Sequence, residues 1–252
     1  MIRAVAVVVP AHNEERLLPG CLESIRAATA YPALAAVRVH TYVVADCCRD
    51  ATARLARAYG ATVTEPRFRS AGAARAHGTA AALDAFLAPG SGLTAAEVWL
   101  AHTDADSRVP RRWLAAQLAC AGEGFEAVVG AVTVDDWSGH TPQTAARFRG
   151  YYAAHRREPG RLPGTHPHVH GANLAVRADA YLAAGGFPPL TTGEDHALVR
   201  ALTARGSRLH RTDRDPVHTS ARRTCRAPAG FGAFLLRLES QADQADQANR
   251  GR

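Results

Sequence analysis

The amino-acid sequence predicts an α/β fold in which helices cover both faces of a mostly parallel β-sheet. Short β-branched runs alternate with longer stretches whose apolar residues recur at helical spacing. The chain has 252 residues, 47% of them hydrophobic, which suffices for one large domain with a substantial core. Acidic and polar residues follow several of the strand-like runs, and ligands bind at the carboxyl ends of strands in sheets of this kind.

The first half of the chain alternates regularly between strands and helices. The run A-V-A-V-V-V at 4–9 predicts a buried strand, and residues 14–28 repeat apolar side chains every three or four positions. Pro110 suits the first turn of a helix, because its missing N–H is not needed there. The expected strands are 4–9, 37–45, 61–65, 98–102 and 128–134, and the expected helices are 14–28, 51–59, 71–87 and 111–121.

The second half is less regular. A helix is expected over 141–157, before a loop at 158–168 that is rich in proline, glycine and histidine. The later expected elements are a strand at 173–176, helices at 178–184 and 194–205, and edge strands at 207–212 and 216–219. No boundary divides the chain, so we expect one domain over 1–230. Residues 231–252 form an amphipathic helix and a polar tail, for which a frayed helix or disorder is expected.

The charge of the chain favours a small phosphorylated ligand. The formal net charge is +7, and all 30 cationic side chains are arginine because the sequence contains no lysine. Arginine binds phosphate and carboxylate bidentately. The arginines are scattered and are not interleaved with aromatic residues, so nucleic-acid binding is not expected. A coding bias towards arginine is an equally good explanation for any single exposed one.

Cysteine usage favours a reducing, cytoplasmic location. There are five cysteines and no C-x-x-C pair, and the neighbours Cys47 and Cys48 are poorly placed for a mutual disulfide. The apolar run at the start is too short for a signal peptide, and no run approaches a membrane span. The amphipathic segment 231–238 leaves peripheral contact with the inner face of a membrane open. Covering the core, or a homodimer contact, is the simpler interpretation of that face.

Four polar segments lie where expected strands end or helices begin. They are P-A-H-N-E-E at 10–15, V-A-D-C-C-R-D-A-T at 44–52, R-S-A-G-A-A-R-A-H-G at 69–78 and T-D-A-D-S at 103–107. Each alone is explained by a helix cap, a turn or close helix packing. Together they lie at one edge of one sheet. Asp104 and Asp106 repel each other there, so a cation is expected beside them.

Three of these segments and two later ones resemble motifs of the family 2 glycosyltransferases, which have the nucleotide-sugar-binding GT-A fold. The segment at 10–15 resembles the opening P-x-x-N-E-E of that family, 46–52 resembles D-D-G-S-x-D-x-T, and 103–107 resembles its D-x-D motif. G-A-N-L-A-V-R-A-D-A-Y-L-A-A-G-G-F at 171–187 resembles the acceptor-side stretch that ends in Gly-Gly-Phe, and G-E-D-H-A-L at 193–198 resembles the Glu-Asp motif. The five motifs occur in the family's order, and the resemblance runs from about residue 5 to about residue 223.

The resemblance implies a Rossmann-like sheet with a small acceptor-side extension, divided into a nucleotide-binding half at 1–107 and an acceptor-side half at 108–230. It also implies an enzyme of the hexosyltransferase class that moves a sugar from a UDP- or GDP-sugar to a hydroxyl acceptor. The cofactor it implies is Mn²⁺ or Mg²⁺, since hard cations prefer oxygen ligands. The residues implied to bind the nucleotide sugar are Pro10, Ala11, Asn13, Glu14, Asp46, Arg75 and Asp104.

The resemblance assigns the remaining roles as follows. Asp106 would hold the metal, helped by Asp104 and by a late histidine, His218. Asp195, next to Glu194, would be the base that takes the acceptor's proton in an inverting transfer. Both acids equally suit the first turn of a helix, where the dipole favours them, and the two roles are compatible. Ala76 stands where the family has an asparagine after its arginine, which weakens that part of the donor match.

Several alternatives stay open. The three histidines His166, His168 and His170 share a face of an extended loop, for which an acceptor-side role is preferred to zinc binding. Arg222 and Arg223 either close over the diphosphate or lie on the surface, and Cys47 and Cys48 are interpreted as packing residues.

Three functions compete with an inverting transferase. A retaining GT-A transferase of the glucosylglycerate type would not use Asp195 as a base. A non-catalytic sugar-nucleotide binder would not hydrolyse the donor. A nucleotidyltransferase would carry a glycine-rich basic loop after its first strand, which P-A-H-N-E-E is not.

Overall fold

A seven-stranded sheet organises the protein, whose computed structural model describes residues 1–156, 166–224 and 230–250. The strand order is β3-β2-β1-β4-β6-β5-β7. Only β6 is antiparallel to its neighbours, β4 and β5. The sheet is therefore mostly parallel, as expected. The strands are β1 (Ala4–Ala11), β2 (Arg38–Ala45), β3 (Thr62–Thr64), β4 (Val98–His102), β5 (Ala127–Thr133), β6 (Leu174–Arg177) and β7 (Leu209–His218).

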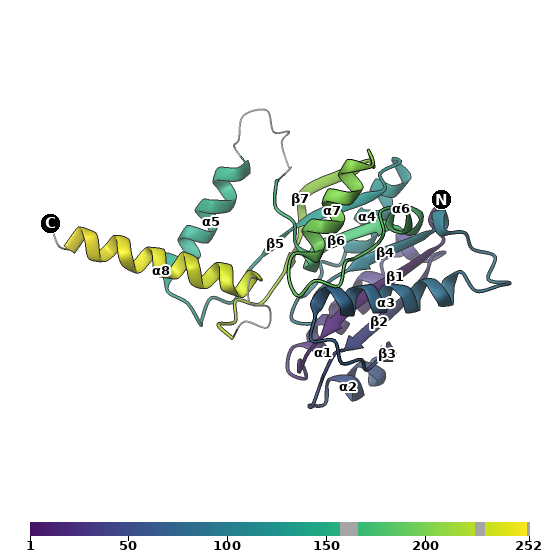
Figure 1. Cartoon of the computed structure of the whole chain (residues 1–252), viewed down its shortest axis with the longest axis horizontal. Helices are drawn as coiled ribbons and strands as arrows, with labels where there is room; N and C mark the ends of the chain where they lie inside the picture. The colour runs from purple at the N-terminus through teal and green to yellow at the C-terminus, as the bar shows by residue number, and fades with distance from the viewer. Residues whose placement is uncertain (157–165, 225–229, 251–252) are drawn as a thin grey trace.

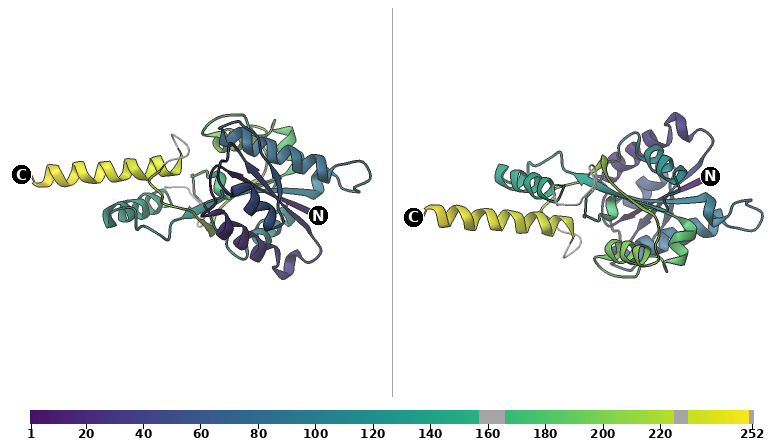
Figure 2. Two further views of the ribbon diagram at one scale, coloured as in Figure 1. Left: turned by 90° about the horizontal axis from the view of Figure 1, so that it is seen from below. Right: turned by 90° about the horizontal axis from the view of Figure 1, so that it is seen from above.

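Helices cover both faces of the sheet, which is seen nearly edge-on in Figure 2. Alternate side chains of β1 belong to two separate cores, since successive residues of a strand point to opposite faces. Val5, Val7 and Val9 pack with α1, α2 and α4, whereas Ala4, Ala6 and Val8 pack with α3, α6 and α7. The helices on the body are α1 (Leu18–Thr29), α2 (Thr52–Ala58), α3 (Ala71–Phe86), α4 (Trp113–Gly122), α6 (Ala178–Ala183) and α7 (Glu194–Ala204).

Two further helices, α5 (Pro142–Arg156) and α8 (Phe231–Arg250), pack against each other and project from the body (Figure 1). Leu235 on α8 is fully buried, and its neighbours Phe231 and Phe234 contact aromatic rings of α5. The amphipathic face of α8 therefore covers part of the protein's own core. The helix continues through the polar segment to Arg250, where a frayed end or disorder was the expectation.

The expected elements of the first half are confirmed to within a few residues, and the main difference lies at the end of the sheet. The two edge strands expected at 207–212 and 216–219 are one strand, β7, with an irregularity opposite β5. Asp215 adopts a φ of 52°, and the chain resumes pairing at Val217. Pro216 is tolerated because β7 is the edge strand of the sheet, where a missing N–H leaves no partner unpaired. The expected loop at 158–168 lies largely outside the described residues.

Candidate active site

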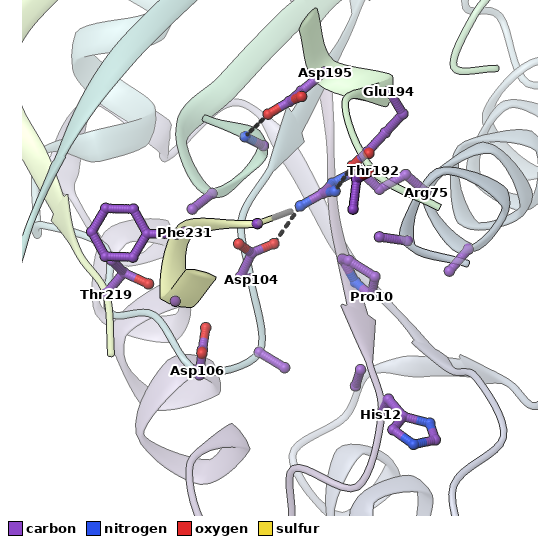
Figure 3. Close-up of a pocket in the computed structure, with 18 of the residues that line it drawn as sticks. Pro10, His12, Arg75, Asp104, Asp106, Thr192, Glu194, Asp195, Thr219 and Phe231 are labelled. Atoms are coloured by element: carbon purple, nitrogen blue, oxygen red, sulfur yellow. Dashed lines mark hydrogen bonds and ion pairs between the residues drawn. The ribbon is translucent and has the colours of Figure 1, made fainter. Parts of the chain in front are cut away.

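A pocket of about 920 Å³ opens at the carboxyl ends of β1, β2 and β4 (Figure 3). The strand register brings the ends of β1 and β2 level, because Ala11 pairs with Ala45. The loops that follow these strands, the start of α3 and the first turn of α7 therefore converge. The residues singled out from the sequence that line this pocket are Pro10, Ala11, Asn13, Glu14, Asp46, Cys47, Arg75, Asp104, Asp106, His170, Glu194, Asp195 and Arg222.

One side of the pocket is built around Asp46 at the end of β2. Its carboxylate accepts backbone hydrogen bonds from Phe68 (2.7 Å) and Ser70 (3.1 Å), which fixes the chain entering α3. The Asn13 side chain accepts a hydrogen bond of 2.7 Å from the Arg49 backbone. Asn13 has a φ of 52°, which asparagine tolerates better than most residues. Nucleotide-binding roles for this group remain a prediction; the structure gathers Asp46 and Asn13 on the same wall.

Arg75 is the central cation of the pocket. It lies in α3, which begins at a helix cap where Ser70 accepts a hydrogen bond from the Ala73 backbone. Its guanidinium forms ion pairs with Asp104 and with Glu194. These carboxylates raise the pKa of Arg75 against the opposing effect of burial, so the side chain stays charged. Arg75 supplies a positive partner for the first acid of the D-A-D motif.

A second arginine pairs with the other acid of that motif. The Arg222 guanidinium donates to Glu14 at 2.5 Å and lies 3.1 Å from the Asp106 carboxylate. Each acid of D-A-D thus has its own arginine, one from α3 and one from the segment after β7. Arg223 points elsewhere, to Glu239 on α8 at 2.6 Å.

Asp106 has the oxygen donor and the environment that suit a hard divalent cation. Its side chain is 12% exposed, and burial raises its pKa to about 6, with Arg222 opposing the rise. A buried carboxylate of this kind is stabilised in its charged form by a nearby cation. Among the described residues, no three His, Cys, Asp or Glu side chains are grouped to hold an ion. Asp106 and Asp104 offer carboxylate oxygens of the kind that such a cation binds.

Asp195 lies in the first turn of α7 and faces the pocket (Figure 3). One carboxylate oxygen accepts a hydrogen bond of 2.8 Å from the Gly171 backbone, and the other accepts one of 2.7 Å from the His196 backbone. These bonds fix the orientation of the carboxylate. Glu194 differs, because it is buried against Arg75 and its pKa is raised chiefly by that burial. Of the two acids, Asp195 is the one that forms no direct ion pair within the described part of the chain.

The structure places His218 outside the lining of the pocket. It ends β7, and its ring lies 2.6 Å from Asp135. The next residue, Thr219, does line the pocket, and its hydroxyl accepts a hydrogen bond of 2.9 Å from Ser107. A role of His218 as a metal ligand stays a prediction that no contact in the structure supports.

Three neighbouring histidines, His166, His168 and His170, stack on one another. Ring centroids lie 5.9 Å apart for His166 and His168 and 6.1 Å apart for His168 and His170. Burial lowers the pKa of His170 to about 3, so its ring is neutral. It accepts or donates a 2.7 Å hydrogen bond with the Tyr152 hydroxyl. The stack reaches the pocket at His170, which lines it, and an acceptor-side role stays a prediction.

Sequence reasoning did not assign Phe231 and Phe234 to the site, although both line the pocket. Phe231 lies 6.0 Å from the His170 ring, centroid to centroid (Figure 3). The available signal was the amphipathic spacing of 231–238, which indicates a buried face without showing what it faces. Arg49 and Arg69 were likewise missed, because an arginine in a loop gives no local sign of its target.

The chain is similar to known proteins in sequence and in fold. The model of the family described as glycosyl transferase family 2 matches residues 6–183, which is more than half of the chain. No curated protein sequence matches the chain. Within the described residues, no helix combines the length and the apolar composition that crossing a bilayer requires.

Three solved structures illustrate the likeness of fold. A mannosyltransferase from Pyrobaculum calidifontis in complex with GDP-Man and Mn²⁺ is 20% identical, with a TM-score of 0.62, over 93% of this chain and 60% of that one. S. aureus TarS is 15% identical, with a TM-score of 0.61, over 88% of this chain and 37% of that one. Glucosyl-3-phosphoglycerate synthase from Mycobacterium tuberculosis, in complex with Mn²⁺, UDP and glucosyl-3-phosphoglycerate, is 18% identical, with a TM-score of 0.56, over 87% of this chain and 73% of that one.

The chain thus spans about a third of the TarS chain and three fifths of the mannosyltransferase. At these identities the likeness concerns the fold. The family match covers the strands and motifs that build one side of the pocket, up to residue 183. The chain belongs to glycosyl transferase family 2 and has the GT-A fold of its structural neighbours.

Proposed function

We propose that the protein transfers a single sugar from a UDP- or GDP-sugar to a hydroxyl group of an acceptor, with inversion at the anomeric carbon. The observation that carries the proposal is the pairing of Asp104 and Asp106 with two different arginines inside one pocket. This arrangement offers both acids for a cation and two guanidinium groups for phosphate oxygens. The nucleotide sugars bound to the mannosyltransferase and to TarS support the donor class.

In the proposed reaction, the acceptor oxygen forms a bond to the anomeric carbon while the bond from that carbon to the diphosphate oxygen breaks. The electron pair of the broken bond leaves with the diphosphate. Asp195 takes the proton of the acceptor hydroxyl, because its carboxylate faces the pocket and is held by the Gly171 backbone. Arg75 stabilises the negative charge that develops on the leaving group.

A divalent cation, Mn²⁺ or Mg²⁺, would be held by Asp106 with help from Asp104, and it would supply positive charge to the departing diphosphate. The Mn²⁺ in two of the similar structures supports a metal of this class. Asn13, Asp46 and the chain around Pro10 would bind the base and the ribose, since they line the pocket at the carboxyl ends of β1 and β2.

The test is calorimetry of UDP- and GDP-sugars with and without Mn²⁺, repeated with Asp106→Ala. We expect binding that needs the metal in the parent protein and that is lost in the variant. Equal nucleotide binding in all four conditions would exclude the metal role. A donor that is never hydrolysed, even slowly, would favour a non-catalytic binder.

A retaining transferase is the second candidate, favoured by the likeness to glucosyl-3-phosphoglycerate synthase. In that case Asp195 would not act as a base. The anomeric configuration of the first-formed product, measured by NMR, distinguishes the two, because inversion changes it relative to the donor and retention does not.

A further inference from the structure

Arg222 bridges two largely buried carboxylates that follow different strands of the sheet. Glu14 follows β1 and is 6% exposed at its side chain, and Asp106 follows β4 and is 12% exposed. The guanidinium of Arg222 lies 2.5 Å from the first and 3.1 Å from the second. The two acids raise the pKa of Arg222, so it stays positively charged despite its burial.

The neighbourhood explains why this cation is needed. Glu14, Asp104 and Asp106 all line the same pocket, and unpaired buried charge is costly. Arg75 neutralises Asp104 and is itself shared with Glu194. Arg222 is therefore the counter-ion for the other two acids.

The segment that carries Arg222 is fixed to the D-A-D loop by several bonds. The backbones of Arg108 and His218 exchange two hydrogen bonds, of 2.7 and 3.0 Å. The Ser107 hydroxyl donates to the Thr219 hydroxyl at 2.9 Å. Arg222 thus reaches Asp106 from a backbone that is already held beside it, and the contact does not depend on a long free loop.

We propose that Arg222 is a built-in counter-ion that competes with the divalent cation for Asp106, so that metal and nucleotide diphosphate bind as a pair. This inference rests on the proposed function, in which Asp106 holds the metal. A metal that binds alone must break the contact between Arg222 and Asp106 and takes on the repulsion of the guanidinium. A diphosphate that binds with the metal gives the guanidinium a new anionic partner.

Binding of the metal and binding of the nucleotide are thermodynamically linked in this proposal. If the nucleotide lowers the cost of displacing Arg222, it strengthens metal binding, and the metal strengthens nucleotide binding by the same factor. Removing the guanidinium should therefore tighten metal binding in the absence of nucleotide and reduce the factor by which nucleotide enhances it.

The neighbouring arginine provides a matched control. Arg223 has the same charge but pairs with Glu239 on α8 and donates to the Gly139 carbonyl at 3.0 Å. It does not line the pocket. Replacing it changes the net charge of the protein as replacing Arg222 does, without freeing Asp106.

The experiment measures free Mn²⁺ by electron paramagnetic resonance, with and without UDP and GDP, in the full chain and in Arg222→Gln, Arg222→Lys and Arg223→Gln. Linkage energies between sites are typically worth about 5- to 150-fold in affinity, so we expect nucleotide to tighten Mn²⁺ binding roughly tenfold or more in the parent protein. Arg222→Gln should bind Mn²⁺ alone at least about fivefold tighter and show less enhancement. Arg222→Lys keeps the charge but cannot bridge both carboxylates, so it should fall between the parent and Arg222→Gln. Arg223→Gln should behave like the parent.

Unchanged or weaker binding of Mn²⁺ alone by Arg222→Gln overturns the inference, provided circular dichroism shows a folded variant. If that variant does not fold, Arg222→Lys carries the test, and binding of Mn²⁺ alone and nucleotide enhancement equal to those of the parent then overturn the inference. The proposed metal site fails separately, when Asp106→Ala leaves Mn²⁺ binding unchanged in the presence of nucleotide. Absence of Mn²⁺ binding under every condition overturns both.

Discussion

Arg75 and Glu194 form a buried ion pair that joins α3 to the first turn of α7. Each side chain is 5% exposed, and the guanidinium also pairs with Asp104 at the end of β4. One arginine therefore connects three segments of the pocket that are distant in sequence. Because the pair is out of water, its loss leaves a buried charge only partly compensated by Asp104, and stability and site geometry depend on the same contact.

The first prediction concerns this pair. Glu194→Ala should lower the free energy of unfolding by about 3 kcal/mol. Removing the carboxylate leaves the Arg75 guanidinium buried without one of its two ion-pair partners. Urea denaturation measures the change. The double variant with Arg75→Leu should lose less than the sum of the two single variants, and strict additivity would contradict a direct interaction.

A second prediction uses the close approach of Gly171 to Arg75. A Cβ at residue 171 would lie 2.5 Å from Nη2 of Arg75, so Gly171→Ala must displace the guanidinium. We expect nucleotide affinity to fall about tenfold, equivalent to about 1.4 kcal/mol. Gly150→Ala is the control, because nothing lies within 4 Å of a Cβ there, and it should leave affinity unchanged while stabilising the helix. Equal calorimetric affinities for Gly171→Ala and the parent would refute the displacement.

The third prediction tests Asp195 as the base. Asp195→Asn keeps an oxygen that accepts from the Gly171 backbone but cannot take a proton, so transfer should slow by about 10²–10⁴-fold. Nucleotide binding should persist. Asp179→Asn is a suitable control, since Asp179 on α6 pairs with Arg177 at the end of β6 and neither residue lines the pocket. An unimpaired transfer rate in Asp195→Asn would remove it from this role and favour a retaining mechanism.

The fourth prediction concerns acid stability. His102 at the end of β4 is fully buried against Phe187, and burial lowers its pKa from 6.5 to about 3. Between these values the unfolded chain binds a proton that the folded protein does not, so stability falls as the pH falls from 6.5 towards 3. His102→Leu should reduce this slope by up to about 1.4 kcal/mol per pH unit. Urea titrations from pH 7 to pH 4 that give parallel curves for parent and variant would contradict the assignment.

Local signals predicted the elements of the first half well. Val5, Val7 and Val9 belong to a short β-branched run that suits a strand buried on both faces, and the strand expected at 4–9 lies within β1. β7 was harder, because Pro216 is a local signal for a break. Pairing with β5 continues past that residue, and only the tertiary context decides it.

Some residues of the candidate site can also be predicted from the sequence, and others cannot. The acids of D-A-D and Asp195 stand next to strand and helix ends, so their placement in a pocket follows from the order of elements. The partner of Glu14 could not be predicted, because Arg222 is 208 residues away and belongs to a segment whose path depends on β7. The phenylalanines of α8 were missed for a related reason, since an amphipathic pattern indicates burial but does not identify the packing partner.

The antiparallel strand β6 lies between β4 and β5 in the sheet, although it follows both along the chain. About 70 residues separate β4 from β6 along the chain, and their synthesis takes roughly 4–14 s at ribosomal speeds. β4 is buried along its whole length in the finished protein, so its open edge is an apolar template for pairing with other chains during that interval. The order of strands in this sheet therefore leaves that edge of β4 without its native partner in the nascent chain until Leu174–Arg177 has been synthesised.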